Sequence, residues 1–374
     1  MDQDDRWLQR ALELAAQAYG ETSPNPLVGA AVVRGGRIVG EGVHRRAGQP
    51  HAEPQALAVA VRAIAPAEPV ERDLTLYVNL EPCSHRGLTP PCVEAILAAP
   101  VARVVASVLD PDPRVSGRGV ELLRAAGVRV DVGCRRREAV ELNHIFIGRQ
   151  LRRRPFVALK VALAADDCIA AAGGKAARIT GEESQRHAHR LRAGHDAILI
   201  GVQTLATDRP RLDRRMYDGP GRSPRRLVVD PHLRARPEWL WANGRAVVFC
   251  AAESLDTRLD QARALEARAD LVGLPRQGAG LDLDALVAAL EPRGIWSVLV
   301  EGGGRTHRAF LDAGLWDRVY LYRNPELRLA GMPWAAEAAW EREKAHAVER
   351  ARLHLGPDEL EVIAHRDSLV DAGR

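Results

Sequence analysis

Four side chains near the start of the chain have the types and the order needed to hold a metal ion and to use it. His51, Cys83 and Cys92 can supply one imidazole and two thiolates. These ligands leave the fourth tetrahedral position of a zinc ion open for water, whose pKa falls towards roughly 7 on binding. Glu53 follows the histidine closely, and its carboxylate can take a proton from that water and return it to a leaving amine. The pattern predicts a hydrolytic zinc site.

The order of these residues, His-x-Glu followed by Pro-Cys and a second cysteine, is that of the zinc-deaminase signature. Residues 84–91, SHRGLTPP, separate the cysteines, where the general signature has only two residues. We expect this segment to form a loop over the metal. Each part alone is more often structural, but together they stand in the required order beside predicted strands and helices. A zinc module without catalysis usually has four protein ligands and would leave Glu53 without a role.

Alternating helices and strands must position these residues. Residues 4–19 place apolar side chains at helical spacing, and residues 30–44 read as a hairpin around two glycines. Helices are predicted to start near His51 and near Cys92, where the positive helix N-terminus favours a thiolate. Further strands are predicted at 74–83, 101–110 and 128–133, with helices at 90–100 and 117–127. This alternation predicts an α/β domain with a mostly parallel sheet.

The 374 residues of the chain suffice for two domains of ordinary size. We place the boundary in GRQLRRRP, residues 148–155, which gives domains 1–148 and 149–374; its three arginines read as a solvated linker. The second domain is also predicted to be α/β. Its predicted strands are PFVALKVALA, DAILIGV, RRLVVD, RAVVFCA, IWSVLVEGGG and DRVYLYRN. Residues 333–350, rich in Ala, Glu, Lys and Arg, are expected to be helical.

Composition argues against several other classes of protein. A net charge of +4, from 53 Lys+Arg and 49 Asp+Glu, and an aromatic content of 4% give little support to nucleic-acid binding. The first residues, MDQDDRW, are acidic where a signal peptide is basic, and no apolar run reaches the ~18 residues that span a bilayer. Five cysteines do not make the dense framework of a secreted disulfide protein. We expect a cytoplasmic protein with reduced thiols, without membrane or nucleic-acid partners.

Four longer segments carry a resemblance to a known family: TSPNPLVGAAVV, GEGVHRRAGQPHAEPQAL, YVNLEPCSHRGLTPPCVEAI and DPDPRVSGRGVELLRAAG. They resemble the bifunctional riboflavin-biosynthesis proteins of the RibD type, in which a pyrimidine deaminase is fused to a pyrimidine reductase. The resemblance implies a cytidine-deaminase-like three-layer α/β domain and a dihydrofolate-reductase-like α/β domain. It also implies removal of the ring amine of a diamino-ribosylamino-pyrimidinone 5′-phosphate, followed by reduction of the ribose to ribityl with NADPH.

The resemblance assigns roles to residues of the first domain. It makes His51, Cys83 and Cys92 the Zn²⁺ ligands and Glu53 the proton shuttle. Contacts to the phosphorylated pyrimidine are expected from Asn25, His44, His85 and Asp110. The family commonly has a basic residue just before Thr-Pro-Pro, whereas this chain has Leu88. We expect Arg86 to supply the missing charge for the substrate phosphate.

In the second domain the resemblance includes Lys160, Thr180 and the segment VEGGGRTHRAFL. The glycines after Val300 and Glu301 end a strand and open a helix, where bare backbone amides can hold a dinucleotide phosphate. Substrate contacts are expected from Arg192, Leu212, Arg215 and Glu301, with the two arginines on its phosphate. NADPH contacts are expected from Ala162, Arg178, Thr204, Asp208 and Gly303, with Arg178 at the extra phosphate. We also expect a homo-oligomer.

Three short segments depart from the family pattern. Its Ser-Leu-Asp-Gly reads Ala164-Ala165-Asp166-Asp167, its Ser-x-Trp-Ile-Thr reads Ala176-Ala177-Arg178-Ile179-Thr180, and its Ala-Pro-Lys reads Asn324-Pro325-Glu326. These departures support a second hypothesis, a deaminase whose other domain is a degenerate scaffold. A third hypothesis, an RNA-editing zinc deaminase, ranks lower because the balanced charge and few aromatics do not provide a channel for a flipped base.

Overall fold

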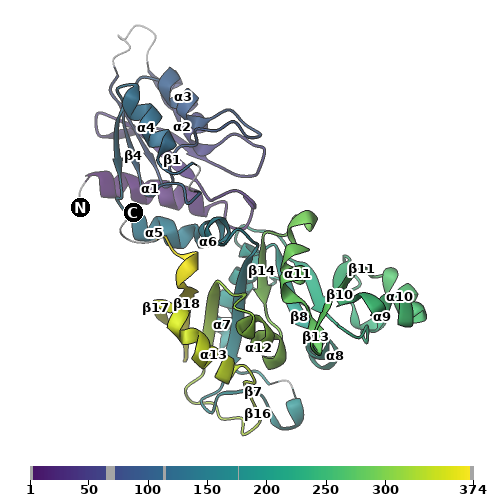
Figure 1. The fold of residues 1–374 in the computed structure, drawn as a ribbon. Helices are drawn as coiled ribbons and strands as arrows, with labels where there is room; N and C mark the ends of the chain where they lie inside the picture. The colour runs from purple at the N-terminus through teal and green to yellow at the C-terminus, as the bar shows by residue number, and fades with distance from the viewer. Residues whose placement is uncertain (1–2, 65–71, 113–114, 176, 371–374) are drawn as a thin grey trace. The chain divides into compact units, whose positions relative to one another are not determined.

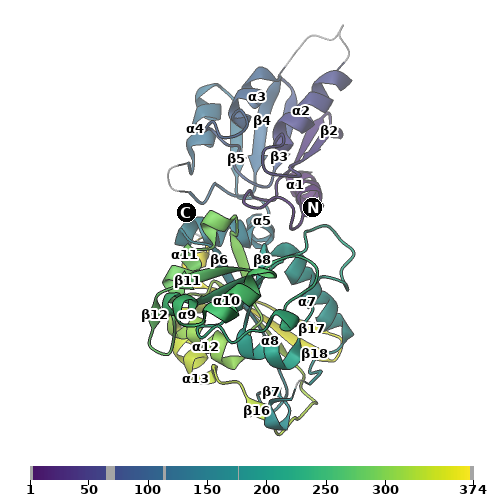
Figure 2. The same ribbon diagram turned by 90° about the vertical axis from the view of Figure 1, so that its right-hand side faces the viewer.

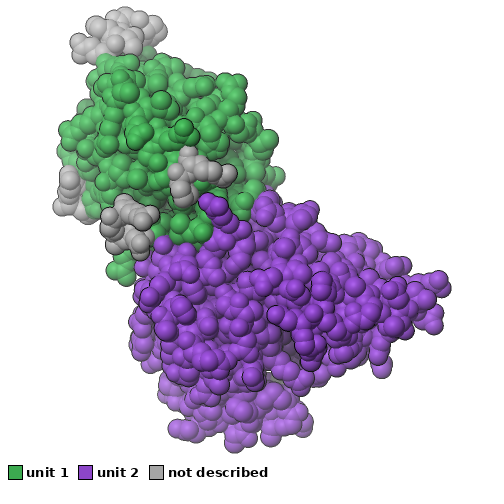
Figure 3. Space-filling model, viewed as in Figure 1, with its two compact units in different colours: residues 1–151, 370–374 green, residues 152–369 purple. Residues whose placement is uncertain are grey.

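The computed structural model describes residues 3–64, 72–112, 115–175 and 177–370 of the chain. The chain divides into two compact units, residues 1–151 with 370–374 and residues 152–369 (Figure 3). Each unit is an α/β domain with its own sheet and hydrophobic core. Among the residues described, no helix is long and apolar enough to span a bilayer.

A five-stranded sheet forms the middle layer of the first unit (Figures 1 and 2). Its strands are β1 Gly29–Arg34, β2 Arg37–Val43, β3 Leu74–Val78, β4 Val101–Ala106 and β5 Arg129–Val132, in the order β2-β1-β3-β4-β5. Strands β1 and β2 form the predicted hairpin, and β1 also pairs antiparallel with β3. The pairs β3 with β4 and β4 with β5 are parallel, as the alternation of strands and helices predicts.

Helices cover both faces of this sheet. They are α1 Gln3–Ala16, α2 Ala52–Ala63, α3 Cys92–Ala98, α4 Arg118–Ala125, α5 Arg136–Leu142 and α6 His144–Arg152. Val33 of β1 shares a hydrophobic cluster with Trp7 of α1, whereas its neighbour Val32 shares one with Ala56 of α2. Because successive residues of a strand point to opposite faces, α1 and α2 lie on opposite sides of the sheet. The result is three layers.

Gly42 sets the distance between β2 and α2. A Cβ atom on this residue would lie 2.1 Å from the carbonyl oxygen of Ala52 and 2.8 Å from the amide nitrogen of Ala56. Any side chain there would push the helix away from the sheet. Because α2 begins at Ala52 with His51 as its N-cap residue, this close approach fixes the position of the histidine.

A nine-stranded sheet runs through the second unit (Figure 1). Its strands are β6 Phe156–Leu163, β8 Ala197–Gly201, β9 Arg225–Val229, β10 Ala246–Ala251, β11 Ala269–Leu274, β14 Ser297–Val300, β15 Arg318–Arg323, β17 Ala347–Leu355 and β18 Asp358–His365. Their order is β11-β10-β9-β8-β14-β6-β15-β18-β17. The strands from β11 to β15 in this order are all parallel. Strand β18 pairs antiparallel with β15 on one side and with β17 on the other. Two small sheets pair β12 Arg276–Gln277 with β13 Gly280–Leu281 and β7 Cys168–Ala170 with β16 Met332–Pro333.

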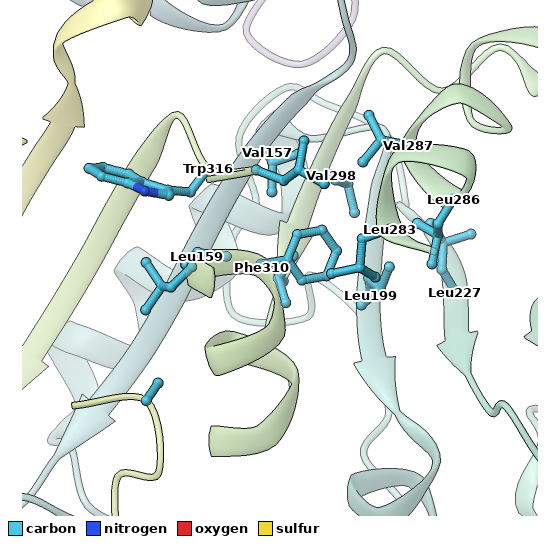
Figure 4. Close-up of a cluster of buried hydrophobic side chains, with 14 of the residues drawn as sticks. Val157, Leu159, Leu199, Leu227, Leu283, Leu286, Val287, Val298, Phe310 and Trp316 are labelled. Carbon is cyan, nitrogen blue, oxygen red and sulfur yellow. The ribbon is translucent and has the colours of Figure 1, made fainter. Parts of the chain in front are cut away.

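The helices of the second unit pack around its sheet. They are α7 Glu182–Gly194, α8 Val202–Asp208, α9 Ala252–Thr257, α10 Leu259–Glu266, α11 Leu283–Ala288, α12 Gly304–Asp312 and α13 Glu337–Glu343. Val157 and Leu159 of β6 belong to the main core together with Phe310 of α12 (Figure 4). Because side chains alternate along a strand, Lys160 lies on the opposite face of β6.

The prediction that residues 333–350 are helical is wrong over much of its length. Helix α13 covers Glu337–Glu343, a 3₁₀ helix follows at Lys344–His346, and β17 begins at Ala347. Residues 347–355 pair with β18 in an antiparallel hairpin. Ladder hydrogen bonds and cross-strand contacts thus outweigh the helix propensity of a segment rich in Ala, Glu and Arg.

The prediction that the three arginines at 152–154 form a solvated linker is also wrong. Arg152 is the last residue of α6, and its Nη2 donates to the carbonyl oxygen of Gly314 at 3.0 Å. Arg154 donates to both carboxylate oxygens of Asp317 at 2.7 and 3.1 Å. The Asp317 side chain is fully buried and needs a cationic partner. Two of the three arginines therefore brace the second unit.

Candidate functional site

The three predicted metal ligands come together from three elements of the first unit. His51 is the N-cap residue of α2, Cys83 lies beyond the end of β3, and Cys92 is the first residue of α3. Nδ1 of His51 lies 3.2 Å from Sγ of Cys92 and 3.6 Å from Sγ of Cys83, and the three ligand atoms lie within 4.8 Å of one another. These separations suit three ligands of one tetrahedral zinc ion, with bonds of about 2.0–2.3 Å.

The loop between the cysteines orients the histidine. Oγ1 of Thr89 lies 3.1 Å from Nε2 of His51. When Nδ1 faces the metal, Nε2 carries the ring proton and donates it to this hydroxyl, which fixes the tautomer and the direction of the ring. The sequence predicts the loop but does not single out Thr89, because a loop hydroxyl has no distinctive pattern.

The two thiols share one proton. The hydrogen bond from the Cys92 thiol, helped by His51 and opposed by burial, lowers the pKa of Cys83 to about 4. The pKa of Cys92 is raised, chiefly because its thiol donates that hydrogen bond. One thiolate is therefore already formed at neutral pH, and metal binding would release the proton from the second thiol.

Glu53 is the buried carboxylate beside these ligands. It is only 3% exposed, and its Oε2 has no hydrogen-bond partner among the residues that the structure describes. Burial, reinforced by the charge on Cys83, raises the pKa of Glu53 to about 7. A buried oxygen without a partner is costly unless a water molecule or a ligand meets it. The donor set and this oxygen together fit a zinc ion that carries a water molecule.

A cavity of about 660 Å³ adjoins the metal ligands, and Asn25 and His44 line it. Nδ2 of Asn25 lies 3.0 Å from Nε2 of His44, and Nδ1 of His44 lies 3.2 Å from the carbonyl oxygen of Pro50. His44 therefore donates through Nδ1 and accepts the asparagine amide at Nε2. Burial lowers the pKa of His44, which keeps the ring neutral. The ring centroids of His44 and His51 are 5.1 Å apart, so Asn25 and His44 lie close to the metal ligands.

Three buried polar residues that the sequence analysis misses hold the walls of this cavity. Asn79 donates to the carbonyl oxygen of Leu27 at 2.8 Å, and Asn143 donates to the same oxygen at 2.9 Å. Both fix the segment that carries Asn25. Glu81 accepts backbone N–H groups of four residues, Asp110, Gly117, Gly119 and Val120. Asn143 is 116 positions from Leu27, so no local pattern reveals such partners.

The predicted residues His85 and Asp110 also line the first cavity. Burial, together with the nearby charge of Glu81, raises the pKa of Asp110 to about 6. The backbone amide of Asp110 is held by Glu81 at 3.0 Å. The structure thus brings eight of the nine residues to which the resemblance assigns a role in the first domain, all but Arg86, to one cavity or to the metal ligands beside it.

The cationic residues that line this cavity do not include Arg86, the one expected from the sequence. Leu88 is 87% exposed and lines the cavity. Arg86 is not among the lining residues, and its guanidinium is exposed and lies 3.7 Å from Glu94. Arg118 of α4 and Arg149 of α6 line the cavity instead. The sequence does not mark them, since Arg118 lies in a predicted helix and Arg149 in the segment that reads as the domain boundary.

A second cavity, of about 670 Å³, lies in the second unit at the carboxyl ends of β6, β8 and β14. Ligands bind at this edge of open parallel sheets. Glu301 follows β14 and accepts Nε and Nη2 of Arg192 at 2.6 and 2.8 Å. The side chains of this pair are only 8% and 14% exposed. Lys160 of β6 lines the same cavity.

The ion pair with Arg192 keeps Glu301 ionised in the second cavity. Burial alone would favour a neutral Glu301, but the charges of Arg192 and Lys160 outweigh it and hold the pKa of Glu301 at about 2. Burial lowers the pKa of Lys160, while Glu301 opposes the shift. The cavity wall therefore carries a permanent carboxylate next to an amine that gives up its proton more readily than an exposed lysine.

The glycine turn after Glu301 is formed as predicted. The amide of Gly303 donates to Oγ1 of Thr204 at 3.1 Å, and α12 begins at Gly304. A Cβ atom on Gly304 would lie 2.8 Å from the backbone nitrogen of Ala335. Only glycine fits at that position, and the turn lines the cavity with its backbone.

The expected cofactor residues all line the second cavity: Ala162, Arg178, Thr204, Asp208 and Gly303. Glu301 lines it too, and Arg192 borders it through Glu301. The remaining two, Leu212 and Arg215, are not among the lining residues, although Asp213 between them accepts Arg192 through its backbone oxygen at 3.0 Å. Leu212 is buried in a hydrophobic cluster, and Arg215 pairs with Asp213.

A hydrogen bond joins two of the segments that depart from the family pattern, and Asp166 of the third segment is bound by a neighbouring loop. Oδ2 of Asp166 accepts the backbone N–H of Ala330 at 2.7 Å, and Nδ2 of Asn324 donates to the carbonyl oxygen of Ile179 at 3.0 Å. Ala176 lies outside the described residues. Of the three segments, only 176–180 contributes residues to the wall of the cavity.

Two family models match the chain. The model for the RibD C-terminal domain matches residues 155–328, and the model for the cytidine and deoxycytidylate deaminase zinc-binding region matches residues 1–108. The riboflavin biosynthesis protein RibD of Aquifex aeolicus is 38% identical over 332 residues, which cover 88% of this chain and 89% of the relative. RibD of Escherichia coli is 38% identical over 338 residues, which cover 87% and 88%.

Two solved structures resemble this chain over nearly its whole length. RibD of Acinetobacter baumannii is 31% identical and superposes with a TM-score of 0.80, covering 97% of this chain and 99% of that one. A diaminohydroxyphosphoribosylaminopyrimidine deaminase/5-amino-6-(5-phosphoribosylamino)uracil reductase of Thermotoga maritima is 30% identical, also with a TM-score of 0.80, covering 97% and 99%.

Proposed function

The chain belongs to the RibD family of riboflavin-biosynthesis proteins, and from this premise we propose which of its residues carry each reaction. It is a bifunctional enzyme, a zinc-dependent deaminase joined to an NADPH-dependent reductase. The scaffold and RNA-editing hypotheses are not favoured. We assign the deaminase to the first unit and the reductase to the second. The two reactions in the name of the Thermotoga maritima relative suggest the substrates of this chain as well.

In the deaminase, Glu53 is the proton carrier. Bound zinc, on His51, Cys83 and Cys92, supplies a water molecule with a pKa of roughly 7. Glu53 takes one proton from that water and passes it to a ring nitrogen, then takes the proton of the added hydroxyl and passes it to the departing amine, so that water and the amino-pyrimidine become the oxo-pyrimidine and ammonia. Its raised pKa suits a group that must both accept and donate near neutrality.

The pyrimidine ring and the phosphate need separate partners. Asn25 and His44 bind the ring, because their fixed hydrogen bond orients both polar groups beside the metal ligands. His85 and Asp110 contact the substrate as well, since both line the same cavity. We assign the phosphate to Arg118 and Arg149, since they are arginines on the cavity wall and guanidinium groups suit phosphate oxygens.

In the reductase, conversion of a ribosyl to a ribityl group consumes one hydride and one proton. Bound NADPH supplies the hydride. Lys160 supplies the proton, because burial weakens its hold on that proton and its side chain lines the cavity. Ionised Glu301 orients the substrate and stays charged through its pair with Arg192. Arg192 and Arg215 serve the substrate phosphate, and Leu212 shapes the backbone leading to Arg215.

We assign the NADPH contacts to residues that line the second cavity. Gly303 and Thr204 hold a phosphate at the glycine turn, and Ala162 and Asp208 adjoin it. Arg178 takes the extra phosphate that distinguishes NADPH. We further propose that the enzyme is cytoplasmic and acts as a homo-oligomer on small phosphorylated pyrimidines.

The orphan oxygen of Glu53 carries this proposal, and replacing it tests the proposal. Glu53→Gln should keep zinc, about one ion per chain from the three-ligand site, but lose ammonia release. Glu121→Gln, an exposed change on α4, is the matched control. Ammonia release by Glu53→Gln at the unaltered rate would refute the assignment.

A further inference from the structure

An aromatic ring lies against the amine of Lys160. Its Nζ is 5.4 Å from the centroid of the Tyr322 ring. The register of β6 and β15 explains this contact: Tyr320 is opposite Lys160, and Tyr322 is opposite Ala162. Tyr322 is therefore the diagonal neighbour of Lys160 on the same face of the sheet. Ala162 has only a methyl group, which leaves space for the ring.

The far end of the Tyr322 ring is held by α7. Its hydroxyl lies 2.6 Å from Nδ1 of His187, and the two rings are 5.9 Å apart. Burial, followed by the charge of Arg190, lowers the pKa of His187 to about 4. The imidazole is neutral at pH 7, so Nδ1 can accept the phenol proton. A phenol that donates its proton gains electron density, and its ring attracts a cation more strongly.

The other groups around Lys160 do not hold it in place. Both oxygens of Glu301 are bound by Arg192, so the carboxylate attracts the ammonium electrostatically while its hydrogen bonds go to the guanidinium. On α12, burial, helped by the charge of Lys160, lowers the pKa of His307 to about 4, so this ring is neutral at pH 7 and offers the ammonium no opposite charge. From α7, β14 and α12, the charged and titratable groups facing this region are His187, His189, Arg192, Glu301 and His307. The ring of Tyr322 is the surface against which the flexible lysine stem can be fixed.

We propose that Tyr322 and His187 are positioning residues for the reduction: they hold the Lys160 ammonium at the cavity wall, aimed at the ribose. The inference rests on the proposed role of Lys160 as proton donor. It predicts that loss of the ring slows proton delivery while leaving NADPH binding intact. It also predicts that loss of the π face destabilises the ammonium, so that Lys160 loses its proton at a lower pH.

The test uses the full-length, zinc-loaded protein and the loss of NADPH absorbance during reduction of the deaminated, ribosylated substrate. Tyr322→Leu should lower kcat about tenfold, the effect of one desolvated cation–π contact, and should move the basic limb of the kcat–pH profile to lower pH. The KM for NADPH should not change. Tyr322→Phe keeps the ring and should stay within about threefold of the unaltered enzyme. Tyr320→Phe, on the same strand and face, is the matched control.

His187 gives a second, independent variant if Tyr322→Leu does not fold, as judged by thermal unfolding. His187→Ala should lower kcat, and His187→Gln, whose amide oxygen can accept the phenol proton, should restore it. Equal kcat values and pH limbs for Tyr322→Leu and Tyr322→Phe would overturn the role of the ring. Equal kcat values for His187→Ala and the unaltered enzyme would overturn the role of the histidine.

A lysine variant separates this inference from the proposed function. If Lys160→Met reduces the substrate at the unaltered rate, Lys160 is not the proton donor and both fail. If Lys160→Met is inactive while Tyr322→Leu is unaffected, the proton donor stands and the positioning role fails.

Discussion

Replacing Arg192 by methionine would leave the carboxylate of Glu301 buried without its partner. The guanidinium makes two hydrogen bonds to that carboxylate, at 2.6 and 2.8 Å, and a third to the backbone oxygen of Asp213 at 3.0 Å. Water cannot readily replace it, since the two side chains are 14% and 8% exposed. We therefore expect a large loss in the free energy of unfolding of the second unit.

Two arguments give the same magnitude. Removal of one partner of a buried ion pair costs about 3–5 kcal/mol. Independently, the pKa of Glu301 lies at about 2, against an ordinary value of 4.5. At roughly 1.4 kcal/mol per pKa unit, the ionised form contributes about 3 kcal/mol. Because the folded-state pKa is lowered, this contribution is present above pH 4.5 and is lost as the pH falls towards 2.

Intrinsic fluorescence reports mainly on the second unit. Six of the seven tryptophans lie in it, at positions 239, 241, 296, 316, 334 and 340. Urea unfolding at neutral pH should show Arg192→Met to be about 3 kcal/mol less stable than the unaltered protein. A transition resolved for one unit is needed here, because a chain of two domains does not unfold as a single two-state system.

Two further variants control this measurement. Arg186→Met removes an exposed pair with Glu182 on the same helix and should cost at most about 0.5 kcal/mol. The double variant Arg192→Met with Glu301→Gln removes the orphan charge and should recover part of the stability. A loss of less than about 1 kcal/mol for Arg192→Met, with no recovery in the double variant, would show that the pair does not carry the stability that we assign to it.

Three other outcomes follow from the first unit. Gly42→Ala should destabilise it by about 2–3 kcal/mol and lower its zinc content, because a Cβ atom would lie 2.1 Å from the carbonyl oxygen of Ala52; full zinc content would contradict this. Thr89→Val should weaken zinc binding about tenfold in a chelator competition, and Thr89→Ser should restore it, since the hydroxyl orients His51. Leu88→Lys should lower the KM for the phosphorylated pyrimidine at low salt and lose that gain at high salt; an unchanged KM would place the phosphate elsewhere.

The parts of the structure that the sequence predicts well are specified locally. His51, Glu53 and Cys92 lie at helix starts, and each start is marked by a change in the apolar pattern within a few residues. The hairpin of β1 and β2 is likewise marked by its paired glycines. Such features depend on neighbours along the chain, so reading the sequence alone is sufficient to find them.

The parts that the sequence does not predict depend on distant partners. Asn143, between α5 and α6, has no distinctive local pattern, and its role depends on Leu27, which folds against it. Arg154 reads as part of a charge run, yet its partner Asp317 lies 163 positions away. The strand β17 has the composition of a helix, and only the adjacent β18 makes it a strand. In each case a tertiary contact outweighs the local preference.

The loop between Cys83 and Cys92 takes part both in metal binding and in the wall of the first cavity. Its ends are metal ligands, Thr89 within it orients the third ligand, and Leu88 and His85 form part of the substrate wall. A substitution that shifts the backbone of this loop also displaces the metal ligands at its ends. Substrate contact and metal binding therefore share one loop in this enzyme, and a change in the backbone of that loop acts on both.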